Sequence, residues 1–293
     1  MSAQGVDARW RATHPLPEIG DGMDKEERGR VLVVGGSAFV PGALLLTGEA
    51  VLRAGAGKVQ LATIASVALS LGILFPEAAV IGLPADAEGE IAADAPDLLK
   101  DQPAKCGSLV LGPGMAARPQ TAGLVEALVA AVGNDVPVLI DAGAMTALVD
   151  RPDVLNWLGS RAVLTPHHGE LATLTGRDKE EIAADPEGAA IDAAARFGVV
   201  LVLKGPDTLI VDGDAPPLRY DSGSPGLGTA GSGDVLAGII AGLLARGMPP
   251  VAAAGWGVWL HGEAGKAAAA AIGPIGFLAR DLLPHIPRLM ARD

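Results

Sequence analysis

The chain has 293 residues, of which 49% are hydrophobic and only 3% aromatic, and its formal net charge is −12. This length and apolar content suffice for one large aliphatic core. With 34 acidic against 22 basic residues, the composition argues against a nucleic-acid partner, because binding a phosphate backbone requires a basic surface. The single cysteine, Cys106, excludes an intrachain disulfide and a thiolate metal cluster, as is typical of proteins in a reducing compartment.

The first 24 residues contain several charged side chains and no apolar run, so we interpret residues 1–24 as an N-terminal extension and predict no secretion signal. The longest apolar tract, Val251–Gly273, is interrupted by His261 and two charged residues, which favours a core helix over a membrane span. We therefore expect a cytoplasmic protein that does not bind membranes. Residues 25–293 are expected to form a single domain.

Short aliphatic runs alternate with longer Ala/Leu-rich segments along the chain. The predicted strands are 30–34, 58–62, 78–83, 108–111, 136–141, 162–165 and 199–203. The predicted helices are 42–54, 118–132, 168–176, 187–197, 235–245 and 251–273. Strands separated by helices of this size predict an α/β fold with a mostly parallel central sheet and helices on both faces. Residues 209–211 and 217–220 are joined through Asp212–Asp214, which predicts a late antiparallel hairpin.

The most informative stretch is the glycine-rich segment Gly223–Asp234. Glycines allow backbone N–H groups to converge on an anion, and a glycine loop that leads directly into a helix N-terminus is an anion site. Asp234 stands at the start of the following helix, where a base beside a bound phosphate is needed. This stretch therefore predicts a phosphoryl-transfer site.

Other glycine-containing motifs in the chain lack residues that their known patterns require. Gly226–Gly231 matches GxGxxG, but a dinucleotide fingerprint belongs to an early strand–helix unit with an acidic residue about 20 positions further on. Neither Gly57-Lys58 nor Gly265-Lys266 has the remaining residues of a Walker P-loop. A Gly-x-Ser-x-Gly elbow between strand and helix is also missing, so a serine hydrolase is poorly supported.

In a parallel sheet, ligands bind beyond the carboxyl ends of the strands. Five predicted strands are followed there by glycine or polar segments, namely Gly35–Ser37, Gly112–Gly114, Asp141, Thr165–Glu170 and Lys204–Gly205. Three of them also have a simpler interpretation. Gly112–Gly114 can be a tight turn, Asp141 can cap the next helix, and Lys204 can extend to the surface. His167 and His168 are not expected to bind a metal, because adjacent side chains point apart and no further His/Cys cluster follows.

Eight segments together carry a resemblance that no single motif carries. They are Gly35–Ser37, Pro41–Ala43, Arg53–Gly57, Leu111–Gly114, Asp141–Ala142, Leu164–Glu170, Lys204–Gly205 and Gly231–Gly238. In order and spacing they resemble the ADP- or ATP-dependent NAD(P)H-hydrate dehydratases of the ribokinase-like superfamily, over about residues 29–246. The chain differs from the pattern of that family at Gly143, Thr146, Ser224 and Gly228.

The resemblance implies a three-layer ribokinase-like fold and a lyase that repairs hydrated NADH or NADPH. ADP or ATP would phosphorylate the ring hydroxyl, phosphate would then be eliminated, and Mg²⁺ would be held mainly by phosphates and water, with no protein metal ligand assigned. Asp234 would contact the hydrate and act as the catalytic base, and Ala43, Gly114 and His167 would line the hydrate pocket. The implied nucleotide contacts are Lys204, Gly205, Pro206, Asp207, Thr208, Gly231, Ser232 and Gly233. A homo-oligomer, specifically a tetramer, is also implied.

Two alternatives remain at this point. The first is a ribokinase-like kinase of a small molecule, such as a hydroxymethylpyrimidine or a hydroxyethylthiazole, which would use Asp234 in the same way but release a stable phosphorylated product. The second is a nucleotide-binding protein without turnover, against which the presence of Asp234 and Pro166-His167 argues. The choice between ADP and ATP stays open.

Overall fold

The computed structural model describes residues 3–291 except 19, 21, 100, 214 and 222. Its described strands form one 10-stranded sheet in the order β1-β10-β9-β8-β7-β6-β5-β2-β3-β4. The strands are β1 (Gln4–Gly5), β2 (Arg30–Val34), β3 (Lys58–Ile64), β4 (Ala79–Leu83), β5 (Ser108–Leu111), β6 (Val138–Ile140), β7 (Ala162–Leu164), β8 (Val200–Leu203), β9 (Thr208–Asp212) and β10 (Leu218–Tyr220). From β4 to β8 every pairing is parallel, whereas β9 runs antiparallel to both β8 and β10.

This topology confirms the predicted α/β fold with a mostly parallel sheet. The late antiparallel hairpin is also confirmed as β9 and β10, although Asp214 in its connection lies outside the described residues. The predicted strand limits were less accurate: β3 continues to Ile64, and β6 begins only at Val138.

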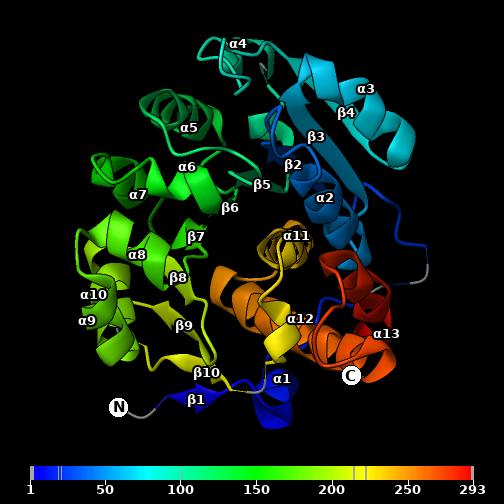
Figure 1. Ribbon diagram of the computed structural model, residues 1–293. Helices are drawn as coiled ribbons and strands as arrows, with labels where there is room; N and C mark the ends of the chain where they lie inside the picture. Colours follow the sequence, from blue (N-terminus) through cyan, green and yellow to red (C-terminus); the bar gives the residue numbers. More distant parts are fainter. Residues whose placement is uncertain are drawn as a thin grey trace.

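Helices cover both faces of the sheet. The α-helices are α1 (Ala8–Thr13), α2 (Ala43–Arg53), α3 (Ala65–Leu74), α4 (Pro96–Leu99), α5 (Pro119–Ala131), α6 (Ala142–Thr146), α7 (Pro152–Leu158), α8 (His168–Thr175), α9 (Lys179–Ala184), α10 (Pro186–Phe197), α11 (Ser232–Ala245), α12 (Pro250–Ile272) and α13 (Ile286–Met290). Short 3-10 helices are η1 (Pro103–Lys105), η2 (Gly159–Arg161), η3 (Pro225–Leu227) and η4 (Ala279–His285). The sheet curves as an arc from β4 to β1, with α2, α11, α12 and α13 inside the curve and α5 to α10 outside it (Figure 1). None of the helices described is long and apolar enough to cross a membrane.

The two layers of helices follow from the alternation of side chains along each strand. In β2, Val31 and Val33 pack into the core that contains α11 and α12, whereas Leu32 and Val34 face the core under α5 and α10. A parallel strand covered on both faces needs apolar residues at every position. This requirement explains why the strands were recognisable in the sequence as short uninterrupted aliphatic runs.

Helix α11 packs against α2 at very short range. A Cβ at Gly238 would overlap the carbonyl oxygen of Thr47, and a Cβ at Gly242 would lie 2.7 Å from that of Val51. Glycine is the residue that allows two helix backbones to approach so closely. The body of α11 is therefore fixed against α2, and its predicted burial is confirmed.

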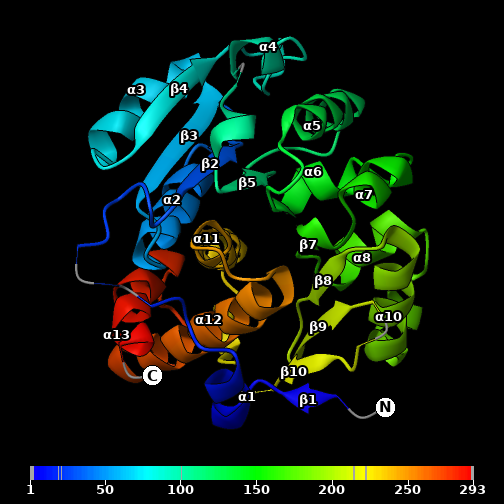
Figure 2. The same cartoon turned by 180° about the vertical axis from the view of Figure 1, so that it is seen from behind.

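The N-terminal segment belongs to the sheet and to the core. Strand β1 pairs in parallel with β10, and Trp10 of α1 is 2% exposed. A Cβ at Gly255 of α12 would lie 2.5 Å from the Trp10 ring, and Trp256 Nε1 donates a hydrogen bond to the carbonyl of His14. Figure 2 shows β1 and α1 at the β10 end of the arc. No strand was predicted here, because a two-residue strand is too short to show a period in the sequence.

Candidate active site

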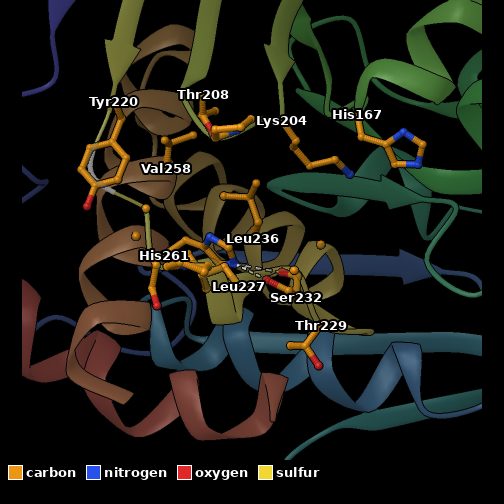
Figure 3. A pocket seen from close by; sticks show the side chains of 18 residues that line it. His167, Lys204, Thr208, Tyr220, Leu227, Thr229, Ser232, Leu236, Val258 and His261 are labelled. Carbon is orange, nitrogen blue, oxygen red and sulfur yellow. Dashed lines mark hydrogen bonds between the residues drawn. The ribbon is translucent and has the colours of Figure 1, made fainter. Parts of the chain in front are cut away.

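A cavity of about 670 Å³ opens beside the carboxyl ends of β7 and β8 (Figure 3). It lies between these strand ends, the loop after β10, and helices α11 and α12. Its lining consists of His167, Lys204, Gly205, Pro206, Thr208, Tyr220, Gly223, Ser224, Pro225, Leu227, Gly228, Thr229, Ser232, Gly233, Leu236, Val258, His261 and Gly262. The location follows the general rule for open α/β sheets, and the size suits a small organic ligand.

The glycine-rich segment ends in the first turn of α11. Gly231 precedes the helix as its cap residue with φ +86°, and a Cβ at that position would lie 2.5 Å from Leu46 Cδ1. Any other residue would be strained there and would also clash. The glycine cap has no side chain to accept hydrogen bonds, and the Ser232 N–H donates to the Thr229 carbonyl at 3.3 Å. The N–H groups of Gly233 and Asp234 are therefore the ones in this turn that can bind a ligand in front of the helix.

Lys204 follows β8 and is held by two carboxylates. Its Nζ donates a hydrogen bond to Asp141 Oδ1 at 3.2 Å and lies 3.6 Å from Glu170 Oε2. Burial disfavours the charged form of Lys204, but the charges of Asp141 and Glu170 outweigh burial and raise its pKa above the ordinary value. Lys204 is therefore a fixed positive charge at the edge of the cavity.

The side chain of Asp141 does not cap the next helix, as the simpler interpretation of the sequence predicted. It was considered as a cap for the next helix, but its side chain makes no capping hydrogen bond to α6. Its Oδ1 instead accepts hydrogen bonds from Thr165 Oγ1 at 2.7 Å and from Lys204. The capping interpretation is wrong because these two partners, which lie on neighbouring strand ends, both bind the carboxylate.

Asp234 is partly buried in the first turn of α11. Burial raises its pKa to about 7, with the negative charge of Asp141 adding to the rise and Lys204 opposing it. A Cβ at Gly233 would lie 3.5 Å from Lys204 Nζ and 3.9 Å from Asp141 Oδ2, so this turn rests directly on the Lys204–Asp141 pair. A carboxyl group with a pKa near neutrality can accept and release a proton during a reaction at that pH.

His261 belongs to the site although its sequence pattern did not predict this. Its Nε2 lies 2.9 Å from Ser232 Oγ and 3.0 Å from the Ser232 carbonyl oxygen (Figure 3). Because a carbonyl only accepts, Nε2 carries the proton, and burial lowers the pKa of His261 to about 4. The ring is therefore neutral and bonded to the first residue of α11. The only signal in the sequence was the polar interruption of an apolar helix.

Comparison with known proteins identifies the family. The family model for NAD(P)H-hydrate dehydratase matches residues 31–288. The chain belongs to the NAD(P)H-hydrate dehydratase family. It is 47% identical to the ADP-dependent (S)-NAD(P)H-hydrate dehydratase of Xanthomonas campestris, over 98% of this chain and 96% of that protein. The family and the enzyme class predicted from the sequence are confirmed.

Solved structures agree with this assignment. The ADP/ATP-dependent NAD(P)H-hydrate dehydratase of Bacillus subtilis, co-crystallised with ATP and Mg²⁺, has a TM-score of 0.82 at 26% identity, over 100% of this chain and 99% of that one. A ribokinase-like superfamily protein of Enterococcus faecalis has a TM-score of 0.84 at 24% identity, over 99% of this chain and 96% of that one. The second likeness concerns the fold alone, and it confirms the ribokinase-like architecture.

Besides Asp234, three residues were predicted to contact the hydrate, and in this dehydratase-family chain they lie in two places. Ala43 starts α2, and a Cβ at Gly114, where φ is +72°, would lie 3.0 Å from the Ala43 Cβ. These two residues are therefore neighbours. His167 lies in the cavity lining and caps α8, with its Nδ1 accepting hydrogen bonds from the N–H groups of Gly169 and Glu170.

Most of the predicted nucleotide contacts lie around the cavity. Lys204, Gly205, Pro206, Thr208, Ser232 and Gly233 line it. Asp207 instead forms an ion pair with Arg219 of β10, and Gly231 is packed against Leu46 and Ala279. The last two residues therefore hold the walls of the cavity in place, and their contact with a nucleotide stays a prediction.

The four departures from the family pattern also separate into two groups. Ser224 and Gly228 line the cavity. Gly143 and Thr146 belong to α6: a Cβ at Gly143 would overlap the carbonyl oxygen of Met115, and Thr146 Oγ1 donates to the carbonyl of Ala142 at 3.3 Å. At Gly143 the absence of a side chain is a packing requirement of this chain.

Proposed function

We propose that this chain restores hydrated NADH and NADPH by transferring a phosphoryl group from ADP to the ring hydroxyl and then eliminating phosphate, with ATP as an alternative donor. The observation that carries the proposal is the position of Asp234 in the first turn of α11, next to Gly233 and the Lys204–Asp141 pair, where burial raises its pKa. The relative from Xanthomonas campestris, which is ADP-dependent, supports ADP as the donor.

Asp234 supplies the proton transfer that the first step needs. Its carboxylate accepts the hydroxyl proton of the hydrate while the hydroxyl oxygen bonds to the terminal phosphorus of ADP, and the bond from that phosphorus to the bridging oxygen breaks to release AMP. In the second step the ring carbon–oxygen bond breaks and phosphate leaves. Loss of a proton from the adjacent ring carbon then restores the double bond.

The negative charge that develops on the phosphoryl group is met by two features of the site. The N–H groups in the first turn of α11 offer hydrogen bonds, and Lys204 offers a fixed positive charge. Both are in place before the ligand arrives, because Gly231 and the Lys204–Asp141 pair are held by their surroundings. Preorganised groups of this kind stabilise a transition state without rearranging.

The nucleotide and the hydrate would approach Asp234 from two sides. We assign the nucleotide to the large cavity, where Lys204–Pro206, Thr208, Ser232 and Gly233 flank the phosphates. The apolar side chains of Leu227, Leu236 and Val258 suit a purine ring. We assign the hydrated nicotinamide to the side of Ala43 and Gly114, with His167 at the edge of the nucleotide cavity facing it. This division leaves the first turn of α11 between donor and acceptor.

Magnesium is proposed to enter with the nucleotide. Among the residues described, no group of three or more His, Cys, Asp or Glu side chains could hold a metal ion. Mg²⁺ retains water readily and is commonly held by nucleotide phosphates, which fits a site without a protein cage. When bound, it would neutralise phosphate charge, and no protein ligand is assigned to it here.

We further propose that the enzyme acts in the cytoplasm as a homo-oligomer, specifically a tetramer. We also propose that the domain predicted over residues 25–293 forms its catalytic unit together with β1 and α1, which belong to the same sheet and core. Helix α3 supports self-association, because Leu69, Ile73 and Leu74 are 77%, 72% and 68% exposed. Exposed apolar side chains grouped on one helix are typical of an interaction surface.

The test is recovery of the reduced nicotinamide. Purified protein is incubated with hydrated NADPH, Mg²⁺ and either ADP or ATP, and the near-ultraviolet absorbance of the reduced ring is followed. We expect recovery with ADP, and slower or equal recovery with ATP. Recovery with neither donor would contradict the proposal, and accumulation of a stable phosphorylated hydrate would identify a kinase instead.

A further inference from the structure

The carboxylate of Asp141 is held at the centre of the site although the reaction described above gives it no role. Its side chain is 4% exposed, and its Oδ1 is bonded to both Thr165 Oγ1 and Lys204 Nζ. A buried carboxylate is costly unless it is paired and hydrogen-bonded, and here both conditions are met. Asp141 therefore stands as a charged group beside the reacting region.

The backbone on either side of Asp141 is fixed by contacts with a neighbouring loop. Ala142 has φ +50° and is the one non-glycine residue with positive φ among the residues described. A Cβ at Gly112 would overlap the Asp141 carbonyl oxygen, and a Cβ at Gly143 would overlap that of Met115. A non-glycine residue in this conformation costs on the order of 1–3 kcal/mol and persists only where the surroundings impose it.

The first turn of α11 lies directly on the Asp141–Lys204 pair. The position of a Cβ at Gly233 is 3.5 Å from Lys204 Nζ and 3.9 Å from Asp141 Oδ2. Asp234 is the next residue along the same turn. Two charged groups act on its carboxyl group, Asp141 after β6 and Lys204 after β8. Glu170 of α8 lies 3.6 Å from Lys204 Nζ, and the neutral His261 of α12 lies 2.9 Å from Ser232 Oγ in the same turn.

We propose that Asp141 is a positioning residue of this enzyme, which holds Lys204 under the first turn of α11 and, through its own charge, controls when Asp234 ionises. This inference rests on the assignment of Asp234 as the base. Two carboxylates close together resist simultaneous ionisation, and the positive charge of Lys204, which is bonded to Asp141, moderates that repulsion. The Asp141 carboxylate accepts hydrogen bonds from both Lys204 and Thr165, whereas no such pair is seen at Asp234 among the residues described.

The directions of the pKa shifts are consistent with this geometry. After burial, the charge of Asp141 is the second cause that raises the pKa of Asp234, and Lys204 is the group that lowers it. Removing the charge of Asp141 should therefore let Asp234 ionise at lower pH. Removing the charge of Lys204 should have the opposite effect. If Asp141 and Lys204 only supported the fold, neither substitution would shift the pKa of Asp234.

The first experiment measures the titration of Asp234 without turnover. The protein is labelled with ¹³C at the aspartate side-chain carboxyl carbon, and the Asp234 resonance is assigned from its loss in Asp234→Asn. We expect its midpoint in Asp141→Asn to fall by about one pH unit. In Lys204→Met, which keeps the Asp141 side chain but removes the positive charge, the midpoint should rise. If neither variant moves the midpoint, or if either moves it the opposite way, the proposal is wrong.

Thr165→Val is the matched control. It removes the hydroxyl that donates to Asp141 but leaves the carboxylate charge in place, so the Asp234 midpoint should stay at its wild-type value. A midpoint that moves as far in Thr165→Val as in Asp141→Asn would mean that any disturbance of this region has the same effect, which would overturn the assignment to charge. The paired Lys204→Met variant keeps the test decisive if Asp141→Asn does not fold.

Turnover then separates this inference from the proposed function. The acidic limb of the pH profile of kcat should move to lower pH in Asp141→Asn by the same amount as the Asp234 titration. If the Asp234 midpoint falls in Asp141→Asn but the acidic limb of the kcat profile does not move, the charge of Asp141 does not control the reaction. Absence of repair activity in the wild-type protein would instead refute the proposed function, while the carboxyl titration would still decide whether the Asp141 charge acts on Asp234.

Discussion

The first turn of α11 and the body of the same helix differ in burial and polarity. In the body, residues from Val235 to Leu244 are buried, and Gly238 brings the helix against the backbone of α2. In the first turn, Gly233 lines the cavity and Asp234 is only partly buried. The difference shows that a rigid, closely packed segment holds a short polar one. Substitutions in the body should therefore affect stability, and substitutions in the first turn should affect chemistry.

The largest effect is expected from Asp234→Asn, which tests the first turn. The amide keeps the shape of the side chain but cannot accept the hydroxyl proton, so kcat should fall about a thousandfold. The affinity for ADP, measured by calorimetry, should change little because the amide leaves the N–H groups of the turn in place. A variant that retains more than a tenth of wild-type turnover would remove Asp234 from the role of base.

Gly238→Ala tests the body of α11. The new methyl group would overlap the carbonyl oxygen of Thr47, and separating two packed helices should lower the free energy of unfolding by about 3 kcal/mol. Urea unfolding measures the change. The matched control is Gly123→Ala in α5, where a Cβ meets no atom within 4 Å. That variant should gain up to about 1 kcal/mol, since alanine favours a helix. Equal effects of the two substitutions would contradict the comparison.

Lys204→Ala tests the charge that faces the first turn. Loss of a charged hydrogen-bond partner should weaken ADP binding about tenfold or more, because such contacts contribute roughly 1.5–3 kcal/mol. Calorimetric titration with ADP gives the dissociation constant. Lys105→Ala is the control, since Lys105 forms an exposed pair with Asp101 on the surface. An unchanged dissociation constant in Lys204→Ala would leave Lys204 without a role in binding the nucleotide.

The smallest effect concerns the pH dependence of stability. Because the pKa of Asp234 is raised to about 7 in the folded protein, its contribution to stability is greatest below its ordinary pKa and is lost as pH rises through 7. Asp234→Asn does not ionise, so its Tm should exceed that of the wild type by a few degrees at about pH 8 and by less at about pH 5. Calorimetric scans at both pH values provide the measurement. A difference that is larger at the lower pH would show that the shift has the wrong sign.

Much of the fold could be predicted from the sequence, because the strands are buried on both faces and so appear as short aliphatic runs. The strand-end segments were also recognisable, since glycines and polar residues such as Lys204 interrupt the apolar pattern there. The short strand β1 and the burial of Trp10 were not predictable, because two residues show no periodicity and a single tryptophan does not reveal what it contacts.

The contacts between side chains within the site could not be predicted from the sequence. Asp141 fitted the pattern of a helix cap, and its bond to Lys204 joins residues 63 positions apart. His261 looked like an interruption in a core helix, and its partner Ser232 lies 29 positions away. Local patterns describe a residue and its neighbours along the chain. Contacts between strand ends and distant helices depend on how the sheet brings these elements together.

One measurement tests the central claim most directly: whether phosphate release accompanies repair at the first turn of α11. Hydrated NADPH, ADP and Mg²⁺ are mixed with the protein, and ³¹P NMR follows AMP and phosphate while absorbance follows the reduced ring. The account predicts that AMP, phosphate and repaired NADPH form in equal amounts, and that all three are lost together in Asp234→Asn. Repair of the hydrate without consumption of ADP would contradict it.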